Sequence, residues 1–150
     1  MGTKFQGTDA EIRALDTYIK LTRAANTMMD RTNAHLSDYH LTVSQFGVLE
    51  ALYHLGTLAQ IELSRKLLLS TGNITTVLQH LEQRSLICRE RDAKDQRVVR
   101  VSLTETGRQL VEAILPSHVA TIVADLNILS AEEQETLAAL CRKLGLQGRR

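Results

Sequence analysis

The chain has 150 residues, which suits a single domain and leaves no room for a second catalytic domain of ordinary size. Hydrophobic residues make up 43% of the sequence, aromatic residues make up 3% and tryptophan is absent, which excludes wholesale disorder and favours an aliphatic, mainly helical core. The formal net charge is only +1, but the segment from Arg84 to Arg100 contains six basic and three acidic residues. Basic charge is therefore concentrated locally, as a binding edge requires.

Several classes of protein and site are not expected. Cys88 and Cys141 lie far apart in sequence and form no metal-ligand pair or disulfide framework, so we expect buried structural thiols. The N-terminus has no apolar signal core and no apolar run approaches membrane-spanning length, so we expect a cytoplasmic protein without membrane contact. Without a phosphate loop, serine elbow or zinc signature, the sequence predicts no enzyme, no cofactor and no metal site.

The first predicted element is a long helix. Thr8 and Glu11 have the spacing of a capping box, which opens a helix at residue 9 that runs to about His35. Its apolar stripe becomes polar at Thr22 and Asn26. This helix is therefore not simply buried in the core of a monomer.

Three short helices follow. The first begins at Thr42 or Ser44 and ends at Gly56, the second spans residues 58–68, and the third spans about 73–84 after a turn at 69–72. Short helices joined by tight turns are typical of a helix-turn-helix domain.

At Leu86 the hydrophobic period changes from 3.6 to 2. Residues 99–103 alternate as a half-buried strand, residues 87–91 form a plausible partner strand, and the charged segment 92–97 connects them. A two-stranded hairpin is marginal alone, so it must pack against the helices as a wing.

The C-terminal third is again helical. A long helix starts near Gly107 and runs to Leu126, with Pro116 expected to kink or split it. Ser130 and Glu133 form a second capping box, which opens a last helix that ends at Gly145.

The most specific motif lies in the predicted wing. Residues 91–107 match the pattern D-x-R-x-x-x-V-x-L-T-x-x-G at every fixed position, from Asp95 and Arg97 to Gly107. With further matches at 41–49 and 70–75, the chain resembles the MarR family of winged helix-turn-helix regulators over nearly its whole length. The resemblance implies a mainly α fold with a small β-hairpin wing and with N- and C-terminal dimerisation helices.

The same resemblance implies an organisation and a function. Residues 1–150 would form a single domain, with dimerisation helices at about 9–38 and 107–146 and a DNA-binding lobe at about 41–106. The expected function is sequence-specific transcription regulation by a homodimer on double-stranded palindromic operator DNA. The regulator would be a repressor released by a small phenolic or quinone-like ligand.

The DNA-contacting residues are expected in two places. Small polar side chains near the start of the third short helix suit base readout in the major groove, and Arg97 at the end of the wing loop suits the minor groove. By resemblance, Asp95 orients the wing loop or Arg97 rather than touching DNA. The full set of predicted DNA contacts is Ser70, Thr71, Asn73, Thr75, Thr76, Gln79, His80, Arg84, Lys94 and Arg97.

The chain departs from the family at several positions. Many relatives carry basic residues where this chain has Thr76 and His80, and glycine where it has Ser85, which weakens the expected charge on the recognition helix. The first helix lacks the reactive cysteine of peroxide sensors. Segments 15–21 and 140–145 look more like the branch that answers to catechols and hydroquinones.

An effector site is expected between the dimer helices and the DNA-binding lobe. The candidates by position are Tyr18, Met28, Met29, Tyr39, His40 and His54. A redox- or metal-responsive regulator of the same fold remains an alternative, as does a winged-helix module that binds other proteins.

Overall fold

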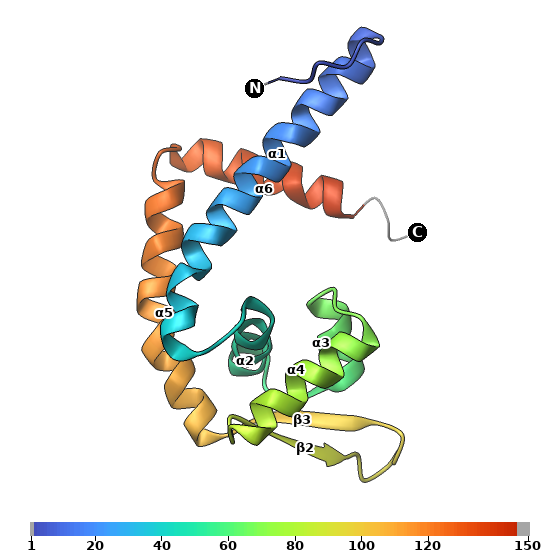
Figure 1. Ribbon diagram of the computed structural model, residues 1–150, viewed down its shortest axis with the longest axis vertical. Coiled ribbons are helices and arrows are strands. Elements are labelled where there is room, and N and C mark those ends of the chain that lie inside the picture. Colours follow the sequence, from blue (N-terminus) through green and yellow to red (C-terminus); the bar gives the residue numbers. More distant parts are fainter. Residues whose placement is uncertain (1, 147–150) are drawn as a thin grey trace. The chain divides into compact units, whose positions relative to one another are not determined.

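A computed structural model describes residues 2–146. In chain order the elements are α1 (Asp9–Asn33), the 3-10 helix η1 (Ala34–Tyr39), α2 (Val43–Leu55), β1 (Leu58–Ala59), α3 (Gln60–Lys66), α4 (Thr71–Gln83), β2 (Ile87–Arg91), β3 (Val99–Leu103), α5 (Glu105–Leu126) and α6 (Ala131–Gly145) (Figure 1). The predicted mainly α fold with a small β wing is confirmed.

The chain divides into two compact units. One, called here the winged unit, comprises residues 33–117, and the other, called the terminal unit, comprises residues 1–32 and 118–150. The main cluster of buried apolar side chains belongs to the winged unit, where Leu49, Leu63 and Leu78 are fully buried. The winged unit therefore has a core of its own.

Side-chain caps explain where several helices begin. Thr42 caps α2 and Ser130 caps α6, each in a reciprocal capping box with the residue three positions on. Thr8 and Glu11 make the same exchange before α1. Gly56 ends α2 with a φ of 77°, which only glycine adopts without strain.

The sheet has three strands rather than the two expected. The order is β1-β3-β2, with Leu58 opposite Val101 and Ala59 opposite Arg100. The prediction that residues 58–68 form one helix was therefore wrong at its start, since Leu58 and Ala59 are extended. A two-residue strand is too short to show a period, and α3 begins only after it, where Glu62 accepts a hydrogen bond from the Ala59 N–H (2.7 Å).

A junction around Thr104 joins α4, the sheet and α5. The Thr104 hydroxyl donates to the Ser85 carbonyl (2.7 Å) and accepts from the Gly107 N–H (3.0 Å), while the Thr104 N–H donates to the Leu86 carbonyl (3.1 Å). Ser85 has a φ of 58° at the turn that leads into β2. The sequence L-T-x-x-G in the wing motif thus encodes a close contact between the start of α5 and the end of α4.

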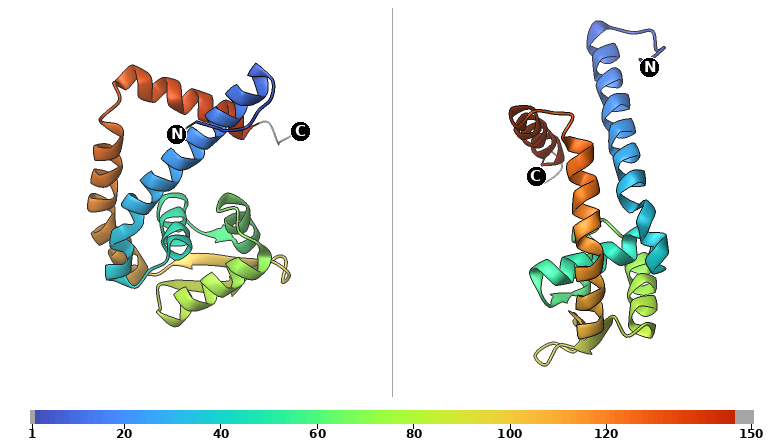
Figure 2. Two further views of the ribbon diagram at one scale, coloured as in Figure 1. Left: turned by 45° about the horizontal axis from the view of Figure 1, so that its top comes forward. Right: turned by 90° about the vertical axis from the view of Figure 1, so that its left-hand side faces the viewer.

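Of the kink or split expected at Pro116, the split does not occur, because α5 is one continuous helix through this residue (Figure 2). Among residues 2–146, α5 is also the one helix long and apolar enough to cross a bilayer by length and composition, which contradicts the expectation that no run reaches that length. Its first half is a core helix, because Val111 and Ile114 are fully buried with the other apolar side chains of the winged unit.

The terminal unit contains most of α1, the end of α5 and all of α6. Arg31 on α1 donates to Asp125 on α5 (2.8 Å), and the Asp125 side chain is only 11% exposed. Thr32 is the only buried residue of α1, and α6 has none. These helices therefore leave most of their apolar side chains uncovered within one chain.

The close contact at Gly107 can be tested by substitution. A Cβ at this position would lie 2.1 Å from the Leu86 carbonyl oxygen, which cannot yield without moving the backbone. We expect Gly107→Ala to lower the free energy of unfolding by roughly 3 kcal/mol, as measured by urea denaturation followed by circular dichroism.

Gly72→Ala is the matched control. Gly72 lies in α4 with nothing within 4 Å of the added Cβ, so the free energy of unfolding should stay within about 1 kcal/mol of the wild type, on the stabilising side. Equal losses in the two variants would contradict the proposed contact.

Candidate nucleic-acid interface

The helix α4 separates an apolar face from a polar one. Ile74, Leu78 and Leu81 are buried, and Ser70 caps the helix by accepting a hydrogen bond from the Asn73 N–H (3.2 Å). Seven of the ten residues expected to contact DNA lie exposed on this helix or at its N-cap, and they are Ser70, Thr71, Asn73, Thr75, Thr76, Gln79 and His80. The polar stripe predicted from the sequence is therefore a single accessible helix face.

The wing loop between β2 and β3 is ordered by Asp92. Its Oδ1 accepts the backbone N–H groups of Lys94 (2.8 Å) and Asp95 (3.0 Å), and its Oδ2 accepts from Arg100 Nε (2.8 Å). Arg100 first, and the two backbone donors next, hold the pKa of Asp92 below its ordinary value. Sequence analysis did not single out Asp92, although an aspartate that opens a polar turn is the usual sign of this bonding.

Arg97 lies at the end of the same loop and is bonded to Asp95. Its Nε and Nη2 donate to the two carboxylate oxygens at 3.0 and 3.1 Å, and the Arg97 N–H also donates to Asp95 Oδ1 (3.1 Å). This pairing lowers the pKa of Asp95 and raises that of Arg97. The Arg97 side chain is nevertheless 90% exposed, so its cation faces solvent.

The remaining arginines of the basic segment differ in what they bind. Arg84 donates to the backbone carbonyls of His40 (2.7 Å) and Tyr39 (3.1 Å), so it joins the end of α4 to the end of η1. Arg89 forms an ion pair with Glu82 (2.9 Å), which lowers the pKa of Glu82. Lys94 is exposed on the wing loop.

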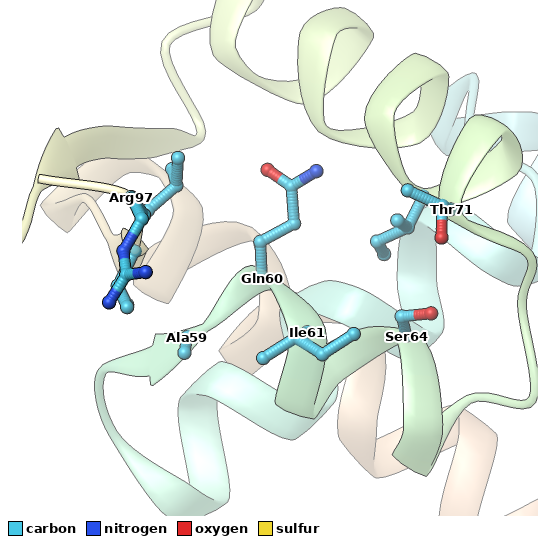
Figure 3. A pocket seen from close by; sticks show the side chains of 9 residues that line it. Ala59, Gln60, Ile61, Ser64, Thr71 and Arg97 are labelled. Carbon is cyan, nitrogen blue, oxygen red and sulfur yellow. The ribbon is translucent and has the colours of Figure 1, made fainter.

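A surface pocket of about 220 Å³ lies between α3, the start of α4 and the wing (Figure 3). Its walls are mostly apolar and include Ile61, Ile74 and Val99, while Gln60 and Arg97 supply polar groups. Arg97 is the one titratable residue in the lining. Of the predicted DNA contacts, Thr71 at the start of α4 and Arg97 of the wing line this pocket.

The six candidate effector residues fall in different units. Tyr18, Met28 and Met29 lie on α1, and of these Tyr18 and Met29 are exposed. The other three belong to the winged unit, where Tyr39 ends η1 and His54 packs edge-on against Tyr53, with 5.1 Å between ring centroids. His40, the third, follows η1 with a φ of 53° and is exposed.

The expectation that both thiols are buried was wrong. Cys88 and Cys141 are both free and exposed, because Cys88 lies on the solvent side of β2 and α6 has no buried face. Within residues 2–146 no three His, Cys, Asp or Glu side chains gather closely enough to hold a metal ion. In that part of the chain, no cluster of metal-binding side chains supports the metal-responsive alternative.

Comparison with known proteins decides the family. A family model described as transcriptional regulator SarA/Rot matches residues 32–114. The HTH-type transcriptional regulator MhqR of Bacillus subtilis is 35% identical over 137 residues, which are 91% of this chain and 94% of MhqR. The chain belongs to the MarR family.

Solved structures of MarR-family proteins agree with this assignment. Bordetella bronchiseptica BpsR, described as regulated in its DNA binding by 6-hydroxynicotinic acid, has a TM-score of 0.77 and 27% identity over 86% of this chain and 98% of BpsR. Staphylococcus aureus MepR in complex with DNA has a TM-score of 0.76 and 28% identity over 85% of this chain and 95% of MepR. This MarR-family chain is thus a winged-helix transcriptional regulator.

The role of Asp92 in the wing gives a prediction of pH dependence. Because its pKa is lowered, Asp92 contributes its bonds fully above its ordinary pKa, near 4, and loses them as the pH falls through the lowered value. We expect heteronuclear NOE values of residues 93–96 to be pH-independent from 7 to about 5 and to fall in stronger acid.

In Asp92→Ala the same NOE values should already be low at neutral pH, because the two backbone hydrogen bonds and the Arg100 ion pair are all lost. Asp38→Ala, which removes an exposed carboxylate from η1, is the control and should leave the wing unchanged. A wing that stays equally rigid in Asp92→Ala would contradict the assignment.

Proposed function

We propose that the protein is a homodimeric repressor that binds palindromic operator DNA through α4 and the wing and is released by a small hydroxylated aromatic ligand. The observation that carries this proposal is the exposed polar face of α4 together with the exposed cation of Arg97, where Thr71 from that face and Arg97 from the wing line one pocket. The assignment of residues 41–106 to DNA binding and of residues 9–38 and 107–146 to dimerisation belongs to the same proposal.

The chemistry of each part suits one groove of DNA. The major groove admits an α-helix, and the amides of Asn73 and Gln79 suit adenine edges there. A flexible cation at the tip of a wing suits a narrow minor groove, where the negative potential is strongest. Since α4 carries no lysine or arginine, affinity would come largely from the wing and the flanking arginines.

The exposed apolar side chains favour a dimer. Sixteen large hydrophobic residues are exposed in the described chain, and only four of them, Val43, Leu55, Ile61 and Leu68, lie in the winged unit. The other twelve lie in the terminal unit, on α1, on the end of α5, on α6 and on the segments beside them. Helices that bury so little within one chain need a partner surface, and a second copy of the same helices is self-complementary.

The ligand class comes from a relative and from the site candidates. BpsR is described as regulated by 6-hydroxynicotinic acid, a ring with a hydroxyl and a carboxyl group. Tyr18, Met28, Met29, Tyr39, His40 and His54 are the proposed contacts, since aromatic and thioether side chains pack against rings and histidine bonds to hydroxyl groups. A regulator of this kind acts on chromosomal DNA, so we place it in the cytoplasm.

The function is tested by selecting duplexes from a random DNA pool and measuring their binding by fluorescence anisotropy. We expect a palindrome, bound with a Kd that rises on addition of 6-hydroxynicotinic acid, catechol or hydroquinone. Arg97→Ala should raise the Kd about tenfold or more, and should lower the salt slope by about one unit if Arg97 binds a phosphate.

Arg13→Ala removes an exposed cation from α1 and serves as the control, with an unchanged Kd. If the pool yields no preferred duplex, the protein is a protein-binding winged-helix module instead. An unchanged Kd in Arg97→Ala would contradict the proposal that the wing contacts DNA through Arg97.

The dimer is tested by sedimentation equilibrium. We expect a mass of twice the 16.7 kDa chain and a shift toward the monomer in Leu140→Glu, because a charge on α6 cannot enter an apolar interface. Leu68→Glu, at an exposed leucine of the winged unit, is the matched control and should remain dimeric. A monomeric wild type at micromolar concentration would overturn the dimer.

A further inference from the structure

The hydroxyl of Thr75 is already engaged within the protein. Its Oγ1 donates to the carbonyl of Thr71, one turn earlier in α4 (2.9 Å), and accepts a hydrogen bond from Nε2 of Gln60 on α3 (3.1 Å). A hydroxyl has one hydrogen to donate, so Thr75 has no donor left for a base. The side chain is nevertheless exposed, so it can offer a base its methyl group and the one lone pair that Gln60 does not use.

Gln60 fixes this arrangement from outside the helix. It lies on the first turn of α3 and extends into the hollow between Arg97 and Thr71 (Figure 3). Its amide Nε2 donates to Thr75 Oγ1, the oxygen whose hydrogen is bonded to the Thr71 carbonyl. The rotamer of Thr75 is therefore set by two elements before any ligand arrives.

We infer that Thr75 selects sequence through its methyl group, which contacts the 5-methyl group of a thymine in the major groove. This inference rests on the proposed function, in which α4 enters that groove. Thymine is the base that displays a methyl group there, and an apolar side-chain contact distinguishes it from the other bases. A helix face without lysine or arginine then reads an A·T pair by shape and apolar contact.

Thr76 differs from Thr75 in one respect. Its hydroxyl also donates to a carbonyl of the preceding turn, that of Gly72 (3.2 Å), but within residues 2–146 no side chain donates to its oxygen. The lone pairs of Thr76 thus remain open to the amino group of an adenine or cytosine. The two neighbouring threonines offer a matched comparison between apolar and polar readout.

The test uses the wild-type protein first. The tightest duplex selected from the random pool is resynthesised with uracil replacing one thymine at a time, which removes only the 5-methyl group. We expect the Kd to rise about fourfold at one thymine in each half-site, the value for one buried methyl-sized group, and about 15-fold when both half-sites are changed.

Variants of Thr75 then separate the methyl group from the hydroxyl. Thr75→Val keeps the methyl group and removes the hydroxyl, so it should bind the thymine duplex within twofold of the wild type and still discriminate against uracil. Thr75→Ser keeps both hydrogen bonds and lacks the methyl group in both subunits, so it should bind about 15-fold more weakly and lose the discrimination at that position. Thermal unfolding by circular dichroism establishes that both variants are folded.

The outcomes separate this inference from the proposed function. Tight, selective DNA binding with no thymine sensitive to uracil would overturn the methyl contact and leave the regulator standing. So would a Thr75→Val variant that loses binding while Thr75→Ser retains it, since that pattern marks a hydroxyl contact. Failure to select any duplex would overturn both.

Discussion

The junction at Thr104 is the contact on which the winged unit depends. There the first turn of α5 meets the carbonyls of Ser85 and Leu86, and Gly107 leaves room for the Leu86 oxygen. Because α4 ends and β2 begins at the same point, this one contact sets the recognition helix against the sheet. Since β3 leads directly into Thr104, the wing is fixed to the same place.

Two arginines of the wing, Arg97 and Arg100, form ion pairs with aspartates of the wing itself. Asp92 holds Arg100 and two backbone N–H groups, and Asp95 holds Arg97. Exposed ion pairs of this kind contribute little to stability, so their main effect is on geometry. The local positive charge seen in the sequence is thus less available than its sum suggests, and Arg97 approaches an anion with part of its charge already paired with Asp95.

Sequence patterns predicted the helices well where a cap and a periodic face coincide. Thr42 and Ser130 begin helices as expected, because a side chain that caps a helix does so locally. Ser70 caps α4, which begins two residues before the expected start, within the segment predicted as a turn. Prediction from the sequence failed where an element depends on a segment far away in the chain. The strand β1 exists only because β3 lies beside it, and two residues carry no period.

In the candidate site, too, features set by local sequence were predicted and contacts between distant segments were not. Exposed polar residues of α4 and the exposure of Arg97 followed from the motif and its spacing. The engagement of Arg84 with the carbonyls of Tyr39 and His40 did not, because those groups are more than forty positions away in sequence. The exposure of Cys88 was missed because strand alternation alone does not tell which face of β2 is covered.

The bonds that fix the side chains of α4 and the wing also bear on the thermodynamics of recognition. Thr75, Thr76 and Asp92 each make side-chain hydrogen bonds within the protein itself, which favour one conformation before DNA binds. Ordering a mobile side chain at an interface costs about 0.5–1.5 kcal/mol, and these residues have already lost that freedom on folding. Association would then proceed with a small conformational entropy change, and discrimination between sequences would appear mainly in the rate of dissociation.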